Sequence, residues 1–89
     1  MNIFPVKSFL IYGSCFYKEN IIGLDKDSQL YMVKEYNNTH TDIYVTYNNK
    51  KIGYVPHNAH EYCSELLKIV YINQHVIRVI PVEFFYNEL

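Results

Sequence analysis

The stretch that decides the fold of this 89-residue chain is Asp42-Ile-Tyr-Val-Thr-Tyr-Asn-Asn-Lys-Lys-Ile-Gly-Tyr-Val-Pro56. Side chains alternate in polarity over its first six residues, which predicts a half-buried strand. Asn48-Asn49 predicts a tight turn, because Asn tolerates the left-handed backbone that hairpin turns need. In the return strand, Gly53 indicates a bulge or a close backbone approach, and Pro56 ends the ladder. The stretch therefore predicts a β-hairpin.

A helix is predicted directly after this hairpin. Asn58 is a suitable N-cap, and Glu61, three residues later, can complete a capping box. Apolar side chains then recur at the spacing of one helical face: Ala59, Tyr62, Cys63, Leu66, Leu67 and Val70. We expect this amphipathic helix to cover one end of a small sheet.

Further strands are predicted on both sides of the hairpin. One runs from about Lys7 to Phe16, and a second from about Gln29 to Tyr36. After a linker at Tyr71–Asn73, the segment Gln74–Phe85 predicts one or two more strands, the first ended or bent by Pro81. Five or six strands with one helix between the fourth and fifth predict a mainly β, OB-like or SH3-like barrel, as a single domain over residues 1–89.

The connections carry their own signals. Asp25–Ser28 predicts a turn, and Asn37–Thr41 is a polar loop without Gly or Pro, so we expect side chains to hold it. The aromatic tail Phe84-Phe85-Tyr86 is expected to be covered by something.

Composition favours a packed domain and limits its partners. Hydrophobic residues make up 49% of the chain and aromatic residues 17%, which excludes a disordered chain. Eight Lys and Arg against nine Asp and Glu give a formal net charge of -1. No global field draws such a chain onto nucleic acid, so any nucleic-acid contact must be local.

The two cysteines, Cys15 and Cys63, are interpreted as buried, reduced thiols of a cytoplasmic protein. An apolar run ending at Ser14-Cys15 superficially resembles a lipoprotein cleavage site, but Lys7 interrupts it and Tyr12 replaces a small aliphatic residue. No stretch is long enough to span a membrane, so no membrane association is expected.

Signals for catalysis are missing from the sequence. It has no serine elbow, no glycine-rich phosphate loop and no convincing carboxylate pair, so we expect no enzymatic activity and no cofactor. The nearest metal motif is His57-x-x-His60-x-x-Cys63, but these side chains fall on different parts of the predicted helix surface. A core thiol and surface imidazoles are the favoured interpretation, and no metal site is expected.

Aromatic side chains offer a second kind of site, a surface on which unpaired bases stack. Phe16, Tyr17, Tyr54 and the loop around His40 are the candidates. The competing interpretation is that these rings form the barrel core, and that Lys50-Lys51 is simply a solvated hairpin tip.

A series of sequence blocks resembles the HIRAN domain over about Leu10 to Leu67. The blocks are Ile11-Tyr-Gly-Ser-Cys-Phe-Tyr17, Val33-Lys-Glu-Tyr-Asn-Asn38, Ile43-Tyr-Val45 and Lys51-Ile-Gly-Tyr-Val-Pro56, followed by the amphipathic helix. The resemblance implies a small OB-like barrel with a helix, found fused to helicases and nucleases and as a stand-alone domain in bacteria and phages. In its best understood member the domain captures the 3′-hydroxyl end of single-stranded DNA at stalled replication forks.

Site residues follow from this resemblance one by one. The family's Arg-Tyr pair after the first strand falls on Cys15 and Phe16, so the ring is kept and the phosphate-binding Arg is not. A shorter loop places His40 where a second stacking Tyr stands and Asp42 as a substitute for the hydroxyl-binding Asp. The implied DNA-binding set is Phe16, Tyr17, Asn38, His40, Asp42, Tyr54 and His57.

Two functional hypotheses remain open. The first is a non-catalytic module that binds single-stranded DNA, including its 3′ ends, in DNA repair, replication or a mobile element. The alternative is a protein-interaction module, phage or mobile-element encoded, that kept the barrel and lost the DNA pocket. It would use strand edges or the tail at Phe84–Tyr86, and it is motivated by the missing Arg and the net charge of -1.

Overall fold

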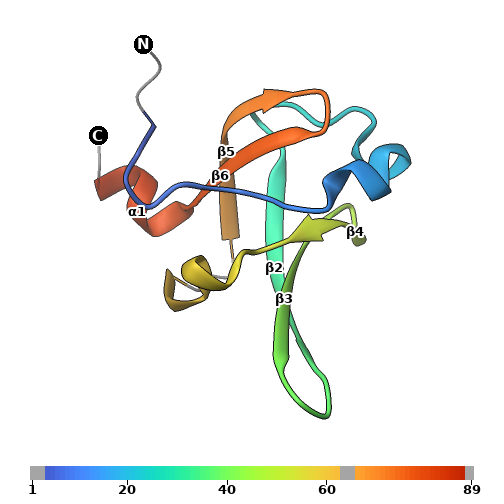
Figure 1. Ribbon diagram of the computed structural model, residues 1–89. Coiled ribbons are helices and arrows are strands. Elements are labelled where there is room, and N and C mark those ends of the chain that lie inside the picture. Colours follow the sequence, from blue (N-terminus) through green and yellow to red (C-terminus); the bar gives the residue numbers. More distant parts are fainter. Residues whose placement is uncertain (1–3, 63–65, 88–89) are drawn as a thin grey trace.

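The structure, a computed structural model, describes residues 4–62 and 66–87. Six strands, two 3-10 helices and one α-helix make up the described chain (Figure 1). In chain order they are β1 (Phe9–Leu10), η1 (Ser14–Ile21), β2 (Gln29–Tyr36), β3 (Thr41–Tyr47), β4 (Lys50–Tyr54), η2 (His57–Tyr62), β5 (Leu66–Asn73), β6 (Val76–Pro81) and α1 (Val82–Asn87).

The strands form one antiparallel sheet in the order β1-β6-β5-β2-β3-β4. It curls into a half-barrel (Figure 1), and an antiparallel bridge between Tyr12 and Tyr54 joins its two edges. The Tyr12 N–H donates to the Tyr54 carbonyl at 3.0 Å, and the Tyr54 N–H donates to the Tyr12 carbonyl at 2.9 Å. The prediction of a small, mainly β, barrel-like fold is confirmed.

The central hairpin is confirmed in detail. Asn48 and Asn49 form its turn with left-handed φ angles of 52° and 64°. The register between β3 and β4 shifts at Val45/Thr46, opposite Gly53. Gly53 also makes the predicted close approach, because a Cβ atom there would overlap the Ile11 side chain and lie 2.9 Å from the Tyr12 carbonyl oxygen.

The core fills the concave side of the half-barrel with apolar side chains from every strand. Period-2 alternation decides which residues of β3 enter it, so Ile43 and Val45 are buried while Tyr44 faces outward. The buried apolar cluster is Phe9, Ile11, Leu30, Ile43, Val45, Ile52, Val55, Ala59, Leu67, Ile69, Ile77 and Val79.

A helical segment does lie between the fourth and fifth strands, but the predicted amphipathic helix is largely wrong. The observed η2 is a 3-10 helix that begins at His57, before the predicted N-cap, and Cys63 lies outside the described residues. Leu66–Asn73, which includes the predicted linker, is strand β5. Its buried Leu67 and Ile69 alternate with less buried neighbours, and β2 and β6 supply partners on both sides. Sheet pairing therefore overrides a helical pattern in the sequence.

The first and last predicted strands are also corrected. Only Phe9–Leu10 is strand in the first, because Gly13 turns the chain with φ 77° into η1. Cys15 therefore lies on η1 and is exposed, which contradicts its interpretation as a buried thiol. Pro81 ends β6 as predicted, but the residues after it form α1 instead of a further strand.

Phe84 and Phe85 of the aromatic tail are partly covered, as expected. The helix α1 contacts β5 and β6, and Phe84 and Phe85 are half-buried. Lys7 Nζ lies 4.2 Å from the Phe84 ring centroid, and Lys68 Nζ lies 5.2 Å from that of Phe85. Among the described residues, no helix is both long and apolar enough to cross a membrane.

Candidate functional site

The outer face of the hairpin is the candidate site. Residues directly opposite one another on antiparallel strands share a face of the sheet. The pairs Glu35–Asp42, Tyr44–Tyr54 and Thr46–Lys51 all lie opposite the buried side of β3. The sequence therefore places tyrosines, carboxylates and a lysine together on the convex side of β2, β3 and β4.

Four rings and one cation form what we call the tyrosine face, which consists of Tyr12, Tyr17, Tyr44, Tyr54 and Lys51. The Tyr12 and Tyr54 ring centroids are 5.6 Å apart with planes tilted by 30°. Lys51 Nζ lies 4.5 Å from the Tyr44 centroid and 4.9 Å from that of Tyr54, within cation–π range. Tyr12 is 48% exposed, so ring surface remains open to a ligand.

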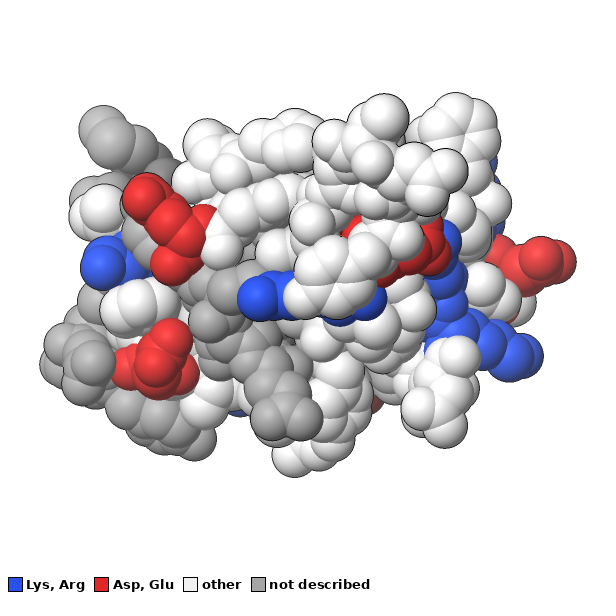
Figure 2. Space-filling model, turned by 90° about the horizontal axis from the view of Figure 1, so that it is seen from below, with Lys and Arg blue, Asp and Glu red and all other residues white. Residues whose placement is uncertain are grey.

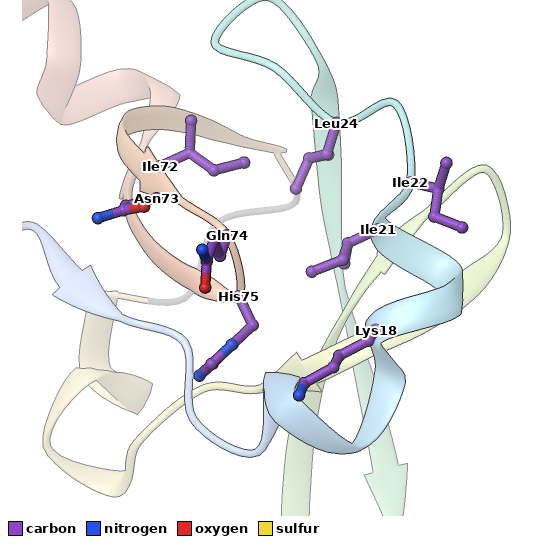
Figure 3. A pocket seen from close by; sticks show the side chains of 8 residues that line it. All are labelled: Lys18, Ile21, Ile22, Leu24, Ile72, Asn73, Gln74 and His75. Atoms are coloured by element: carbon purple, nitrogen blue, oxygen red, sulfur yellow. The ribbon is translucent and has the colours of Figure 1, made fainter.

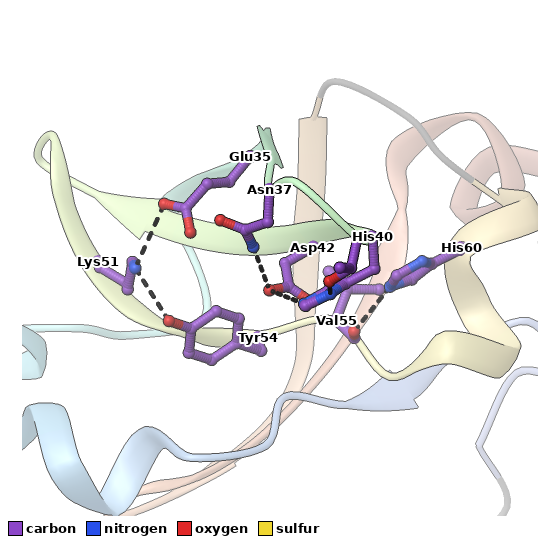
Figure 4. A network of polar contacts seen from close by, with 9 residues as sticks. Glu35, Asn37, His40, Asp42, Lys51, Tyr54, Val55 and His60 are labelled. Carbon is purple, nitrogen blue, oxygen red and sulfur yellow. Dashed lines mark hydrogen bonds and ion pairs between the residues drawn. The ribbon is translucent and has the colours of Figure 1, made fainter.

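Polar contacts fix the centre of this face (Figure 4). Lys51 Nζ donates to the Tyr54 hydroxyl at 3.0 Å and lies 3.9 Å from Glu35 Oε2. A hydrogen bond between the Tyr17 and Tyr54 side chains raises the pKa of Tyr17. Hydrogen bonds from Lys51 and then Tyr17 lower the pKa of Tyr54, since both stabilise its phenolate, and the bond to Tyr54 raises the pKa of Lys51.

The His40 loop is the second polar group of the site (Figure 4). His40 Nε2 donates to Asp42 Oδ2 at 3.2 Å, and Asn37 Nδ2 donates to the same oxygen at 3.1 Å. Thr39 Oγ1 lies 2.9 Å from His40 Nδ1, and the Asn37 N–H donates to the His40 carbonyl at 2.8 Å. The prediction that side chains hold this loop is confirmed. The turn at Asp25–Ser28 is likewise formed, with the Ser28 N–H donating to the Asp25 carbonyl at 3.1 Å.

The helix η1 positions Tyr17 and covers the edge of β4. It is kinked at Tyr17, where φ is -126° and ψ is 32°. The Asn20 side-chain amide donates to the Lys51 carbonyl at 2.9 Å, which satisfies an acceptor on an otherwise open strand edge. The buried Ser14 hydroxyl donates to the His75 carbonyl and ties the start of η1 to the β5–β6 turn.

The structure brings the residues predicted from sequence together only in part. Tyr17 contacts Tyr54, and His40 contacts Asp42. No hydrogen bond or ion pair within the described chain joins these two pairs directly. Glu35 lies between them, since it approaches Lys51 and is the β2 partner of Asp42.

The other three predicted residues lie at the margins. Phe16, on η1, is 84% exposed, and Asn38 is exposed in the His40 loop. His57 is exposed on η2, with its ring centroid 4.8 Å from that of His60, and His60 Nε2 donates to the Val55 carbonyl at 3.0 Å (Figure 4). Each is accessible to a ligand.

Sequence reasoning missed Tyr12, Tyr44, Lys51 and Glu35 as parts of the site. The alternation in β3 could have found Tyr44, because it puts this ring on the polar face beside Asp42 and Thr46. Nothing local pointed to Tyr12, whose place depends on a bridge to a distant strand.

Electrostatically the site is mixed. Glu35 and Asp42 stand opposite each other on the same face as Lys51. Figure 2 shows acidic and basic side chains interspersed among uncharged ones over one face of the molecule. Among residues 4–62 and 66–87, no group of three or more His, Cys, Asp or Glu side chains could hold a metal ion.

Comparison of the chain with protein-family models, curated proteins and solved structures finds no match. The chemistry of the site therefore follows from its own residues. It offers exposed ring surface, a cation beside two of the rings, and a carboxylate held by two side-chain donors.

Proposed function

We propose that this chain is a non-catalytic, HIRAN-like module that binds single-stranded DNA through the tyrosine face. The observation that carries the proposal is the Tyr12–Tyr54 ring pair, in which Tyr12 is exposed, with Lys51 beside it. Bases stack on aromatic rings whatever their sequence, and each stack contributes about 1–3 kcal/mol. A chain with a net charge of -1 can bind a strand this way, because stacking does not need a large positive field.

Tyr54 and Lys51 supply polar contacts beside the stacked bases. The Tyr54 oxygen accepts a hydrogen bond from Lys51, which leaves its own O–H to donate to a phosphate or a base carbonyl. Lys51 also carries the positive charge nearest to the rings. Its distance of 3.9 Å from Glu35 is long for a strong pair, so a DNA phosphate can compete for it.

Asp42 is the proposed acceptor for a terminal 3′-hydroxyl. Both of its donors bind Oδ2, so Oδ1 remains to accept a hydrogen bond. A carboxylate accepts a hydroxyl but repels a phosphate, which would favour a free 3′ end. Phe16, Asn38 and His57 are exposed on the adjoining segments and complete the proposed contact set. A role at strand ends fits DNA repair, replication or a mobile element.

The first test measures stacking. A 5′-labelled short oligothymidylate is titrated at low salt and its fluorescence anisotropy recorded. Tyr12→Ala should weaken binding about fivefold or more, because it removes one stack. Tyr36→Ala is the matched control, since Tyr36 is 76% exposed on the other face of β2 and should not affect binding. Equal effects of the two variants would overturn the role of the tyrosine face.

A second titration tests the strand end with 3′-hydroxyl and 3′-phosphate versions of the same oligonucleotide. We expect the parent chain to prefer the hydroxyl end. Asp42→Asn should remove the preference, since an amide does not repel phosphate. If the parent chain binds the 3′-hydroxyl and 3′-phosphate oligonucleotides equally, the role of Asp42 is rejected while the role of stacking is not affected.

A second candidate function is binding of a protein, and the carboxylates of the site favour it. Glu35 and Asp42 flank the tyrosine face and repel a phosphate backbone. Exposed tyrosines are also common at the centres of protein interfaces. Failure of the parent chain to bind either oligonucleotide at low salt would shift the proposal to this alternative.

A further inference from the structure

A groove lies on the other side of η1, away from the tyrosine face. One wall is formed by η1 and the segment that follows it, and the other by the β5–β6 turn (Figure 3). The volume of the groove is about 620 Å³. Sites for small molecules typically measure about 300–1,000 Å³. Its lining residues are Lys18, Ile21, Ile22, Leu24, Ile72, Asn73, Gln74 and His75.

The floor of the groove is apolar and packs against the core. Ile21, Leu24 and Ile72 are partly buried and pack against the hydrophobic core. In Figure 3 their side chains point into the space between η1 and the β5–β6 turn, whereas Ile22 points away from it. An aliphatic chain placed there would exclude water from this surface, a favourable contribution that grows with the area covered.

Two side chains with N–H donors line one end of the groove. Lys18 on η1 and His75 on the β5–β6 turn both line this end, and Lys18 extends toward the turn (Figure 3). Neither Lys18 Nζ nor the His75 ring has a hydrogen bond or ion pair within the described part of the chain. The His75 backbone is held in place, since its carbonyl accepts the hydrogen bond of Ser14. Two free N–H donors at the end of an apolar trough match a carboxylate head with an aliphatic tail.

We propose that this groove binds a small amphipathic monocarboxylate. The carboxylate lies between Lys18 and His75, and the aliphatic tail runs over Ile21, Leu24 and Ile72. This site is separate from the tyrosine face and requires no nucleic acid.

Octanoate is a suitable probe, with octanol as the probe that keeps the tail and lacks the charge. Methyl-selective NMR titration of the full chain should move the Ile21, Leu24 and Ile72 methyl signals, with a dissociation constant on the order of 1 mM or tighter. Octanol should bind about threefold more weakly, because it cannot form the charged contact with Lys18.

Two substitutions test the head group without touching the core. Lys18→Gln should weaken octanoate about threefold and leave octanol binding unchanged. Lys26→Gln is the matched control, an exposed lysine in the turn before β2 and outside the groove. The proposal is overturned if octanoate and octanol bind equally, if the shifts fall outside the groove, or if no methyl moves at millimolar octanoate.

Discussion

The tyrosine face and the groove lie on two sides of the same short helix. They differ in whether their polar side chains already have hydrogen-bond partners. On the tyrosine face, Lys51 and Tyr54 are bound to each other and to neighbours before any ligand arrives. In the groove, Lys18 and His75 have no side-chain hydrogen bond or ion pair within the described chain.

This difference has energetic consequences for binding. Ordering a free side chain such as Lys18 costs about 0.5–1.5 kcal/mol on association, whereas a side chain already held loses less. The tyrosine face should therefore bind rigid, planar groups with little rearrangement. The groove should gain its affinity from its apolar floor, with the charged end acting mainly on selectivity.

Gly53→Ala should cause the largest loss of stability, and it should disrupt the tyrosine face. The new Cβ would overlap the Ile11 side chain and lie 2.9 Å from the Tyr12 carbonyl, at the bridge that joins the sheet edges. We expect a loss of about 3 kcal/mol in the free energy of unfolding, measured by urea denaturation.

Gly23→Ala is the control for this substitution. Gly23 also has positive φ, 87°, but a Cβ there meets nothing within 4 Å. Only backbone strain should act, at a cost of about 1 kcal/mol. Similar losses for the two variants would mean that the chain around Ile11 and Tyr12 shifts to make room for a Cβ at Gly53.

Ser14→Ala should act mainly on the groove. The Ser14 side chain is buried, and its hydroxyl is the donor that joins η1 to the His75 carbonyl. Removing it leaves that carbonyl unsatisfied and should lower the free energy of unfolding by about 1–2 kcal/mol. Ser28→Ala, which removes a hydrogen bond in an exposed turn, should cost less than about 0.5 kcal/mol. Octanoate binding should weaken in Ser14→Ala while DNA binding persists. Weaker DNA binding with unchanged octanoate binding would contradict the separation of the two sites.

The parts of the fold that could be predicted from sequence are those set by local signals. The β3–β4 hairpin follows from alternation and from two asparagines that adopt positive φ. Strand β2 was predicted with its observed bounds, Gln29–Tyr36. The His40–Asp42 contact could be predicted for the same reason, since its partners are only two residues apart in the chain.

Other features depend on partners distant in sequence. The apolar residues of Leu66–Asn73 fit a helical stripe as well as a strand, and only pairing with β2 and β6 decides for the strand. Tyr12 lies in an apolar run that reads as continuous strand, but Gly13 ends it and the bridge to Tyr54 brings Tyr12 into the site. The groove depends on where η1 meets the β5–β6 turn, which no local pattern encodes.

Lys51→Gln should have the smallest and most selective effect. It removes the contacts that Lys51 makes within the tyrosine face and leaves the rings in place. The Lys51 hydrogen bond is the main cause that holds the pKa of Tyr54 below its ordinary value of 10.0, so its loss should raise that pKa.

The effect on stability should be small because the contributions oppose each other. The lowered pKa of Tyr54 stabilises the fold above pH 10, and that gain is lost as pH falls through the pKa of Tyr54 in the folded chain. The raised pKa values of Lys51 and Tyr17 stabilise the fold below their ordinary values, 10.5 and 10.0, and that gain is lost as pH rises through the folded values.

The measurement is an NMR titration of the tyrosine ring carbons between neutral and alkaline pH. In the parent chain, Tyr54 should ionise before Tyr17, and Lys51→Gln should narrow the interval between them. Lys50→Gln provides the control, because Lys50 is exposed at the hairpin turn, whereas Lys51 contacts the rings. If Tyr54 titrated identically in all three proteins, Lys51 would not be bound to it in solution. The tyrosine face would then resemble the groove, with a free cation that a ligand has to order.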